Sequence, residues 1–413
     1  MRNPIATKEQ SVFELKGLEL FKDPRIIKTM EEVKEYWIAE NNPSVEMLEC
    51  FSWAFEEVMF AAVIWSSNQD PLYPAVITIT RLTHELQGHQ IPGTRWGIDN
   101  PDSVYRVIPI SGNERYIIHG KVGKNRLTEN YFTLWDDEMK TVDVLNGKYL
   151  KLENDGSFII SVDSEPANGR ANHIQSNPRA HQFYIRDVML DWANEELNEL
   201  SIERLGPEPS RPPFSFDKQI ELTAEYMWRW ARDTVRWNAQ PDGVAVNTFK
   251  FTIDRDTDGA LRNQIYILGK FNLPSEEHAL IVTISMGGAD YFVAPLSNEW
   301  GTTYDILNYT ASLNKHQSVV NKDGTYTYVL AAKDPGVHNW LNSCGYHEGT
   351  ITLRWAEFKD GCPDETLNAT TNLVKLEDLM KHLPVETLTV DAAQRVKQES
   401  ERKQSYIWRL LEN

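Results

Sequence analysis

The sequence predicts an α+β protein built from antiparallel β-sandwich or jelly-roll-like lobes, with a helical N-terminal segment, a helical insertion and C-terminal helices. Near the N-terminus the apolar residues recur at helical spacing, whereas from about residue 98 their period changes to two. No regular alternation of strands and helices is present, which argues against a Rossmann or TIM-barrel fold. With 413 residues the chain exceeds one typical domain, so we expect two lobes that share a large core.

The predicted boundaries divide the chain into five regions. In order, these are a helical N-terminal region, a first β-rich lobe, a helical insertion, a second β-rich lobe and a helical tail: 1–95, 96–190, 191–245, 246–360 and 361–413.

Residues 11–66 are predicted to be helical. Ser44 follows a proline and suits an N-cap, and Met47, Phe51 and Phe55 then recur at helical spacing. The proline-containing passage 70–74 is expected to end that helix.

The first β-rich lobe is predicted from short runs of β-forming residues. Two of them, 105–110 and 115–122, surround a Gly/Asn turn and predict a hairpin. Residues 158–162 and 182–186 continue the pattern, so this lobe is expected to contain an antiparallel sheet.

The helical insertion is predicted to hold a short helix at 191–200 and a longer one at 217–237. Arg229, Arg232 and Arg236 form a stripe on the longer helix. A stripe of this kind can receive an anionic partner, but we favour a solvated face that pairs with the excess acid of the chain.

In the second β-rich lobe, Asp323-Gly324 marks a hairpin turn. The strands predicted in this lobe are 248–253, 264–268, 279–284, 319–320 and 326–330. The tail from residue 373 on is predicted to be helical. Its apolar end, 406–411, is expected to dock on the body of the protein or on a second subunit, which would give a homo-oligomer.

The chain is acidic, with a formal net charge of −18 and a pI near 5.1. Nucleic-acid binding needs a basic footprint that is not found in this sequence. A neutral or cationic small molecule is therefore the expected partner. Most of the acidity is attributed to solubility.

Cysteine usage and the N-terminus indicate a cytoplasmic protein without a membrane partner. Cys50, Cys344 and Cys362 are odd in number and widely spaced, so no disulfide framework is implied, although pairing of Cys344 with Cys362 stays open. The N-terminus lacks the apolar segment of a signal peptide. The longest apolar run, 58–65, is too short to span a membrane.

Several motifs point to one family: Ser312-Leu313-Asn314, Gln317, Asp323-Gly324, Asp334-Pro335-Gly336-Val337, Asn339-Trp340-Leu341, Gly345, Gly349 and Arg354-Trp355. Together they resemble the family called domain of unknown function 1214. The segments 99–105, 187–192 and 202–206 look like further signatures of it, so the resemblance covers roughly residues 95 to 357. One departure is Asn172-His173, where an Asn-Trp pair is expected.

The resemblance implies β-rich lobes of jelly-roll type, and it implies no established reaction or cofactor. Relatives often carry a companion module, domain of unknown function 1254, ahead of this one. Because the N-terminal segment is predicted to be helical, that companion is not recognised here.

The first candidate site is the block 334–341. Pro335-Gly336 makes a turn in which the Asp334 carboxylate can accept backbone N–H groups. In a strand, His338 and Trp340 would share one face. A histidine beside an indole and near a carboxylate can act as an acid or a base, so His338 is the catalytic candidate and Trp340 a substrate-binding candidate. A purely structural turn is the competing interpretation, favoured for Asp334 and Trp340.

The second candidate site lies at the start of the first β-rich lobe. Asp102 and Tyr105 are predicted to assist the histidine, because a carboxylate with a tyrosine suits proton transfer. Arg95, Trp96 and Arg354 are predicted to bind substrate, because arginine in an aromatic setting often clamps a carboxylate or stacks on a ring. Turn formation explains the acidic residues of this cluster equally well.

No metal site and no cofactor are predicted. His84-Glu85 and His89 give a His-Glu-x-x-x-His spacing, one residue longer than the zinc-protease pattern, and Gly88 disfavours a helix there. Neither a glycine-rich phosphate loop nor a Gly-x-Ser-x-Gly elbow is found.

We therefore expect a cofactor-independent enzyme, of hydrolase or lyase/hydratase type, that acts on a hydrophobic or aromatic small molecule. The alternative is a non-catalytic jelly-roll module that binds carbohydrates or polyphenols. A third possibility is an assembly role through the C-terminal helix. An enclosed site would favour the enzyme, and a shallow aromatic surface would favour the binding module.

Overall fold

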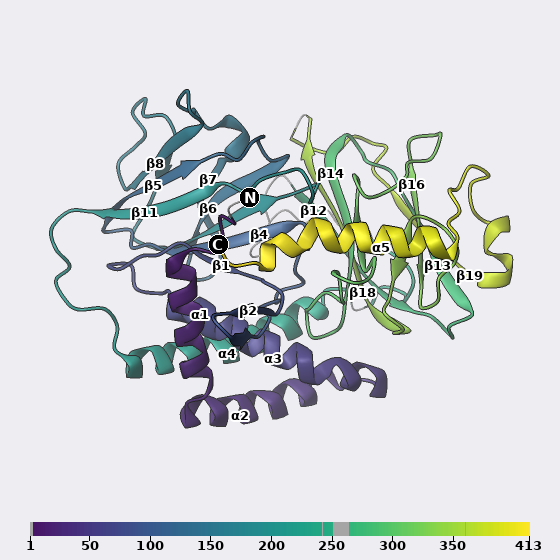
Figure 1. Ribbon diagram of the computed structural model, residues 1–413, viewed down its shortest axis with the longest axis horizontal. Helices are drawn as coiled ribbons and strands as arrows, with labels where there is room; N and C mark the ends of the chain where they lie inside the picture. The colour runs from purple at the N-terminus through teal and green to yellow at the C-terminus, as the bar shows by residue number, and fades with distance from the viewer. Residues whose placement is uncertain (1–2, 242, 251–263, 360) are drawn as a thin grey trace.

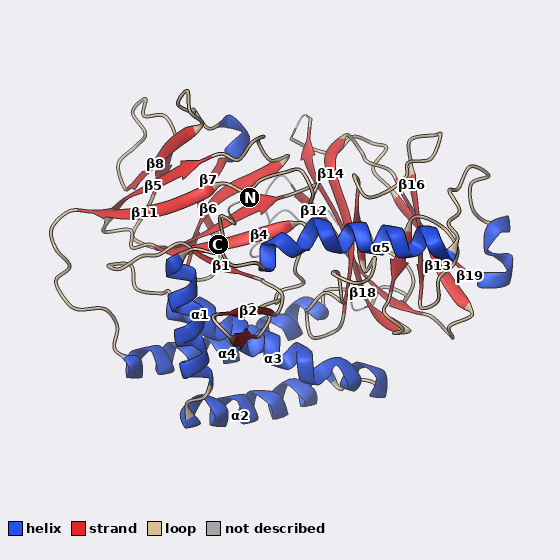
Figure 2. Cartoon of the chain, in the orientation of Figure 1, coloured by secondary structure: helices blue, strands red, loops and turns tan. Residues whose placement is uncertain are grey.

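The computed structural model describes residues 3–241, 243–250, 264–359 and 361–413. Two β-rich lobes lie side by side, and a group of helices lies along one side of the first lobe (Figure 1). Figure 2 shows that strands dominate both lobes while helices gather near the N-terminal region and in the C-terminal segment. The predicted α+β fold with sandwich-like sheets is confirmed.

The N-terminal helices are α1 (Lys8–Phe21), α2 (Pro24–Asn41) and α3 (Val45–Ser67). Ser44 caps α3 as predicted, since its hydroxyl accepts the N–H of Met47 at 3.0 Å. The second half of α3 is buried on all sides, because α1, strand β1 (Ile77–Ile79) and helix α4 (Phe216–Asn238) surround it.

The first lobe is a sandwich of two sheets. Its five-stranded sheet has the order β1-β4-β10-β6-β7, and its four-stranded sheet has the order β11-β5-β8-β9. The additional strands are β4 (Ser103–Pro109), β5 (Arg115–Lys121), β6 (Glu129–Asp136), β7 (Thr141–Asn146), β8 (Ser157–Asp163), β9 (His173–Gln175), β10 (Ala180–Val188) and β11 (Glu199–Leu205). Side chains such as Ile108, Phe132 and Ile160 fill the space between the two sheets.

The hairpin predicted from 105–110 and 115–122 is wrong. Both runs are strands, but β4 pairs with β1 and β10, whereas β5 pairs with β8 and β11 in the other sheet. Ile110 before the turn and Tyr116 after it both belong to the core of the first lobe. The turn therefore carries the chain across the sandwich, which lets both strands bury an apolar face in the same core.

The second lobe is also a sandwich, with sheet orders β12-β18-β14-β15 and β17-β16-β13-β19. Its strands are β12 (Gln264–Asn272), β13 (His278–Ile284), β14 (Ala289–Ser297), β15 (Ser312–Asn314), β16 (Tyr326–Ala331), β17 (Trp340–Asn342), β18 (Glu348–Phe358) and β19 (Ala369–Lys375). Leu280 and Val282 of β13 face the inner core, while Ala279 and Ile281 pack under the outer apolar cluster with Trp340. Burial on both faces explains the continuous apolar run of this strand.

Three local predictions need correction. Residues 191–200 do not form a helix, because a turn follows Asp191 and β11 begins at Glu199. The predicted helical N-terminal region also holds β1 and the hairpin of β2 (His84–Leu86) and β3 (His89–Ile91). Residues 248–250 lie outside any strand, and 251–253 lie outside the described residues.

The C-terminal tail begins as a strand rather than a helix. Residues 369–375 form β19 on the edge of β13, and helix α5 (Ala392–Ile407) follows. Figure 1 shows α5 running along the second lobe toward the first. Its apolar end docks on the body of the protein, where Tyr406 packs edge-on against Trp192 at 5.2 Å. In the described part of the chain, none of the helices combines the length and apolarity that a membrane crossing requires.

Candidate functional site

The two faces of the five-stranded sheet differ in character. One face lies in the sandwich core. On the other face, Arg186 of β10 is paired with Tyr105 of β4 on one side and with Tyr131 of β6 on the other. Two residues further along the strands, Glu129 of β6 is paired with Val188 of β10. Directly paired residues of antiparallel strands point to the same side. The sheet therefore presents a polar and aromatic face away from its own core.

The N-terminal helices cover one part of this face. Trp65 of α3 stacks on Tyr184 with ring centroids 5.6 Å apart, and its indole N–H donates to Gln182 Oε1 at 2.9 Å. Tyr184 also stacks on Trp135 at 4.3 Å and on Tyr105 at 5.2 Å. These rings form a rigid aromatic wall.

The second lobe covers the remainder. Tyr266 of β12 and Arg354 of β18 are cross-strand partners, and the Arg354 guanidinium lies 5.3 Å from the Tyr266 ring centroid. The side chain of Gln264 donates to Glu129 of the first lobe. We call the residues gathered here the interlobe cluster: Tyr105, Glu129, Tyr131, Tyr184, Arg186, Gln264, Tyr266, Arg354 and Glu357.

Glu129 is the most unusual member of the interlobe cluster. It has no exposed surface, and burial raises the pKa of its carboxyl to about 8, with the like charge of Glu357 adding to the rise and Arg186 and Arg354 opposing it. Among the residues that the structure describes, its Oε2 atom has no hydrogen-bond partner. Glu129 is therefore a protonated acid near neutral pH, with one oxygen that its neighbours do not use.

Glu357 lies next to this acid. Its side chain accepts a hydrogen bond from the Tyr131 hydroxyl and forms an ion pair with Lys148 at 2.6 Å. Glu357 is 5% exposed and has a φ of 58°, in the left-handed region that residues other than glycine rarely adopt. Such strained residues often occur at functional sites.

Two tyrosines of the cluster, Tyr184 and Tyr266, remain neutral donors. Burial raises the pKa of Tyr266 to about 12, and it also raises the pKa of Tyr184. Both side chains are only partly buried. Arg186 lies over Tyr184 with its guanidinium carbon 4.5 Å from the ring centroid.

Asp102 lies beside the cluster but is fully engaged. Its carboxylate accepts hydrogen bonds from Trp192 Nε1 at 2.8 Å, the Tyr291 hydroxyl at 2.8 Å and Asn314 Nδ2 at 2.9 Å. Burial nevertheless raises the pKa of Asp102 to about 6. Because Trp192 belongs to the first lobe and Tyr291 and Asn314 to the second, this carboxylate holds the lobes together.

Of the predicted site residues, Tyr105 and Arg354 belong to the interlobe cluster and Asp102 adjoins it. Arg95 lies elsewhere, where it forms paired contacts with Glu57 of α3 at 2.6 and 2.7 Å and donates to the carbonyl of Thr303 at 2.6 Å. Trp96 stacks on Trp230 of α4 at 3.8 Å. Arg95 and Trp96 therefore join helices to the lobes.

The block 334–341 also lies apart from the interlobe cluster. Arg395 of α5 makes two hydrogen bonds to the Asp334 carboxylate, at 2.9 and 3.0 Å, and lies 4.9 Å from the Trp340 ring centroid. The Trp340 indole N–H donates to the Ala331 carbonyl at 2.9 Å. The block thus anchors the C-terminal helix to the second lobe.

His338 lies in the same anchor. One of its ring nitrogens is 3.3 Å from the Gln317 carbonyl and 3.5 Å from Gln398 of α5. Burial lowers the pKa of His338, and the charge of Arg395 lowers it further. It lines a small cavity of about 20 Å³, enough for one water molecule. His338 and Trp340 therefore do not converge with Asp102 or Arg95.

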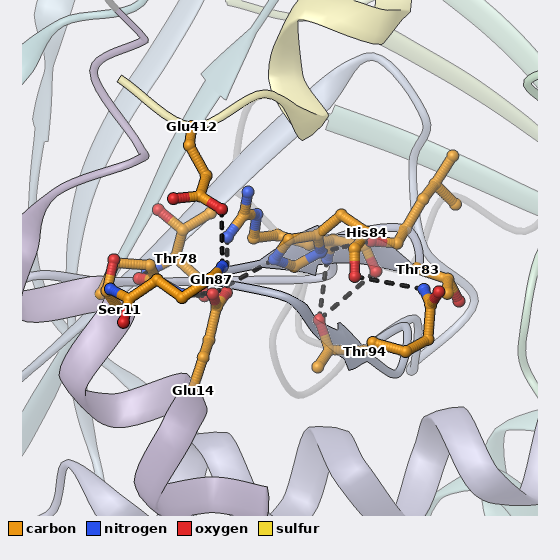
Figure 3. A network of polar contacts seen from close by, with 12 residues as sticks. Ser11, Glu14, Thr78, Thr83, His84, Gln87, Thr94 and Glu412 are labelled. Carbon is orange, nitrogen blue, oxygen red and sulfur yellow. Dashed lines mark hydrogen bonds and ion pairs between the residues drawn. The ribbon is translucent and has the colours of Figure 1, made fainter.

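His84, singled out by the His-Glu-x-x-x-His spacing, lies in a second buried network. Figure 3 shows Glu14 of α1 pointing toward it: Glu14 Oε2 is 3.1 Å from His84 Nε2, and Glu14 Oε1 is 2.5 Å from Arg81 Nη1. The other ring nitrogen of His84 faces the Leu82 carbonyl at 2.9 Å. Over the described ranges, no group of three or more His, Cys, Asp or Glu side chains could hold a metal ion.

Sequence reasoning missed Glu129, Arg186, Tyr266 and Glu357. A signal was present in 129–135, where Glu129, Tyr131 and Trp135 fall on one face of a period-two pattern and the apolar Phe132 and Leu134 on the other. No strand is predicted for these residues from the sequence, so their shared face is not identified. The residues next to Glu357 in the sequence do not predict its left-handed backbone conformation.

Neither a family model nor a curated protein matches the chain. A solved structure of an uncharacterized protein from Burkholderia cenocepacia is similar, with a TM-score of 0.73 and 22% identity over 87% of this chain and 99% of that chain. The VPA0106 protein from Vibrio parahaemolyticus gives a TM-score of 0.44 and 11% identity over 78% of this chain and 99% of that chain. The first likeness shows a shared fold, and the resemblance to domain of unknown function 1214 stays a prediction.

Proposed function

We propose that the chain is a cofactor-independent enzyme of hydrolase or lyase/hydratase type, acting on a hydrophobic or aromatic small molecule at the interlobe cluster. The observation that carries this proposal is Glu129, a fully buried carboxyl with a pKa of about 8 and, within the described part of the chain, an unpartnered oxygen. A positioned acid whose pKa lies near the working pH is suited to proton donation.

The chemistry requires only the side chains present. In the protonated state Glu129 donates its proton to the leaving-group oxygen of an ester while water attacks the carbonyl carbon and the bond between that carbon and the leaving-group oxygen breaks. For an activated alkene it donates the proton to the terminal carbon, and the double bond is consumed as water attacks the adjacent carbon. The attacking water then returns a proton to the Glu129 carboxylate, so the acid is regenerated. Proton transfer by a placed side chain typically contributes about 10²–10⁴-fold in rate.

Substrate binding is assigned to the groups around the acid. The Tyr184 ring, which is only partly buried and stacks on Trp135, offers apolar contact area. The Tyr105 hydroxyl, which accepts the Asn100 N–H at 3.1 Å, keeps its own proton for donation. The Arg354 guanidinium donates through Nη2 to the Ile98 carbonyl. Its Nε atom has no hydrogen-bond partner within the part of the chain that the structure describes. Arg354 is therefore the candidate for holding a polar group of the substrate.

The test uses purified protein and two neutral aromatic probes, phenyl acetate for hydrolysis and 4-vinylphenol for hydration. Turnover in ¹⁸O-labelled water is followed by mass spectrometry, with Glu129→Gln as the test variant and the exposed Glu153→Gln as the matched control. We expect Glu129→Gln to lose about 10²–10⁴-fold in kcat/KM. Wild-type activity should fall tenfold per pH unit above about pH 8, where Glu129 loses its proton.

Equal rates for Glu129→Gln and wild type on both probes, or activity that rises above pH 8, would contradict this assignment. A non-catalytic carbohydrate- or polyphenol-binding module remains the second candidate, favoured by the stacked rings around Tyr184. In that case catechol would bind wild type and Glu129→Gln alike by calorimetry, and neither protein would turn over a probe.

We propose a cytoplasmic location, membership of the family called domain of unknown function 1214, and homo-oligomer formation through α5. Val396 of α5 is 66% exposed and Leu411 beyond it is 55% exposed, which leaves apolar surface for a second copy. Light scattering of Val396→Lys tests the last point, since a monomeric wild type would contradict it.

A further inference from the structure

Glu357 departs from the alternation of its strand. Leu353 and Trp355 of β18 point into the core of the second lobe, and regular alternation would send Glu357 there as well. Instead, Phe358 is the next residue in that core, and Glu357 before it has a left-handed φ of 58°. The carboxylate thereby points toward the first lobe.

Two groups of the first lobe contact this carboxylate. The Tyr131 hydroxyl donates to Oε1, and the Lys148 ammonium lies 2.6 Å from Oε2. Asn146 donates in turn to the Tyr131 oxygen at 3.1 Å, which orients the hydroxyl. The Lys148 side chain is 28% exposed, so the ion pair lies at the edge of the cluster.

We propose that Glu357 is a positioning residue, whose negative charge keeps the proton on Glu129 so that this acid is ready to donate it. The proposal rests on the proposed function of Glu129 and adds the residue that sets its protonation. Tyr131 is two residues from Glu129 on the same face of β6, so the two carboxyl groups are neighbours across the lobe interface.

Opposing charges surround Glu129. Arg186 of β10 and Arg354 of β18 favour its ionised form, whereas Glu357 and Asp102 favour its protonated form. Tyr266 and Tyr291 are neutral, and the side chain of Gln264 donates to one oxygen. Removing the charge of Glu357 leaves the two arginines opposed mainly by burial, so Glu129 should ionise at lower pH.

The experiment observes the Glu129 proton directly. Infrared spectroscopy in D₂O records the carbonyl stretch of protonated carboxyl groups between pH 5 and 9, and the band lost in Glu129→Gln identifies this residue. In Glu357→Gln, which keeps the size and an acceptor for Tyr131, we expect the midpoint of that band to fall by at least one pH unit. The exposed Glu153→Gln should leave the midpoint unchanged.

A second variant protects the test against misfolding. Glu357→Gly removes the charge and adopts the left-handed φ without strain, so it should show the same downward shift. The matching readout in turnover is the basic limb of the pH profile, which should move to lower pH by the same amount. A midpoint that stays within 0.3 unit of wild type in both variants, or rises, overturns the inference.

The two proposals fail in different ways. If the infrared midpoint shifts but neither aromatic probe is turned over, Glu357 sets the Glu129 proton and the assigned reaction is wrong. If the probes are turned over with dependence on Glu129 but the midpoint does not shift, the reaction stands and the role of Glu357 is wrong.

Discussion

Two buried carboxyl groups in this protein have opposite surroundings. Glu14, in the network of Figure 3, accepts hydrogen bonds from Gln10 and Arg81 on one oxygen and contacts His84 on the other. Glu129 in the interlobe cluster meets Gln264 on one oxygen and, within the described ranges, no partner on the other.

Their proton affinities diverge for that reason. Burial would raise the pKa of Glu14, but the His84 hydrogen bond and the Arg81 charge outweigh it and lower the pKa below the usual value. At Glu129 burial and a second carboxylate act in the same direction and raise the pKa to about 8. Burial alone therefore does not mark a functional acid; the balance of neighbouring charge does.

The largest expected effect comes from breaking the satisfied network. Glu14→Gln leaves the Arg81 guanidinium buried without a counter-charge, so we expect a loss of about 3–5 kcal/mol in the free energy of unfolding. Urea denaturation measures this change. The control is Glu85→Gln, at an exposed position next to His84 in β2, and it should change stability by less than about 0.5 kcal/mol. A loss below about 1 kcal/mol at Glu14 would show that the network is not charged as described.

The next effect is a dependence of the protein's stability on pH that originates at Glu129. Between the usual value of 4.5 and about 8, the folded chain keeps the Glu129 proton and the unfolded chain does not. The stability supplied by this group is therefore fully present below about pH 4.5 and declines by up to about 1.4 kcal/mol per pH unit as pH rises to about 8.

Glu129→Gln removes this component. The variant should gain melting temperature relative to wild type as the pH rises from 5 to 8, which scanning calorimetry can follow. Parallel curves for the two proteins across that range would show that Glu129 is ionised in the fold.

A smaller effect is expected at the anchor of the C-terminal helix. Arg395→Met keeps the stem that packs near Trp340 but loses the two hydrogen bonds to Asp334, so we expect a loss of about 1–3 kcal/mol. Limited proteolysis near α5 should accelerate. Arg25→Met, at an exposed ion pair, should have little effect on either measurement.

The smallest effect is expected at His338. It contacts Gln317 and Gln398 rather than the interlobe cluster, so His338→Ala should keep wild-type turnover of any probe that depends on Glu129. Its cost in stability should stay near 1 kcal/mol. A drop in turnover comparable with that of Glu129→Gln would return the catalytic role to His338.

Local signals in the sequence were informative where the structure depends on neighbours along the chain. The helical spacing after Ser44 predicted α3 and its cap, and period-two alternation predicted β8 and β10. The Gly/Asn turn predicted between 105–110 and 115–122 is present between β4 and β5. Its assignment to a hairpin failed because the choice of partner strand depends on the shared core.

By itself the sequence determined the fold class, the helix start at Ser44 and three candidate site residues, Asp102, Tyr105 and Arg354. Only the tertiary structure decided which of them meet. Glu129 and Gln264 are 135 residues apart, and Tyr131 and Glu357 are 226 apart. Hydrophobic period and caps act over a few residues, whereas desolvation and charge act through space, so the proton affinity of Glu129 exists only once both lobes are folded together.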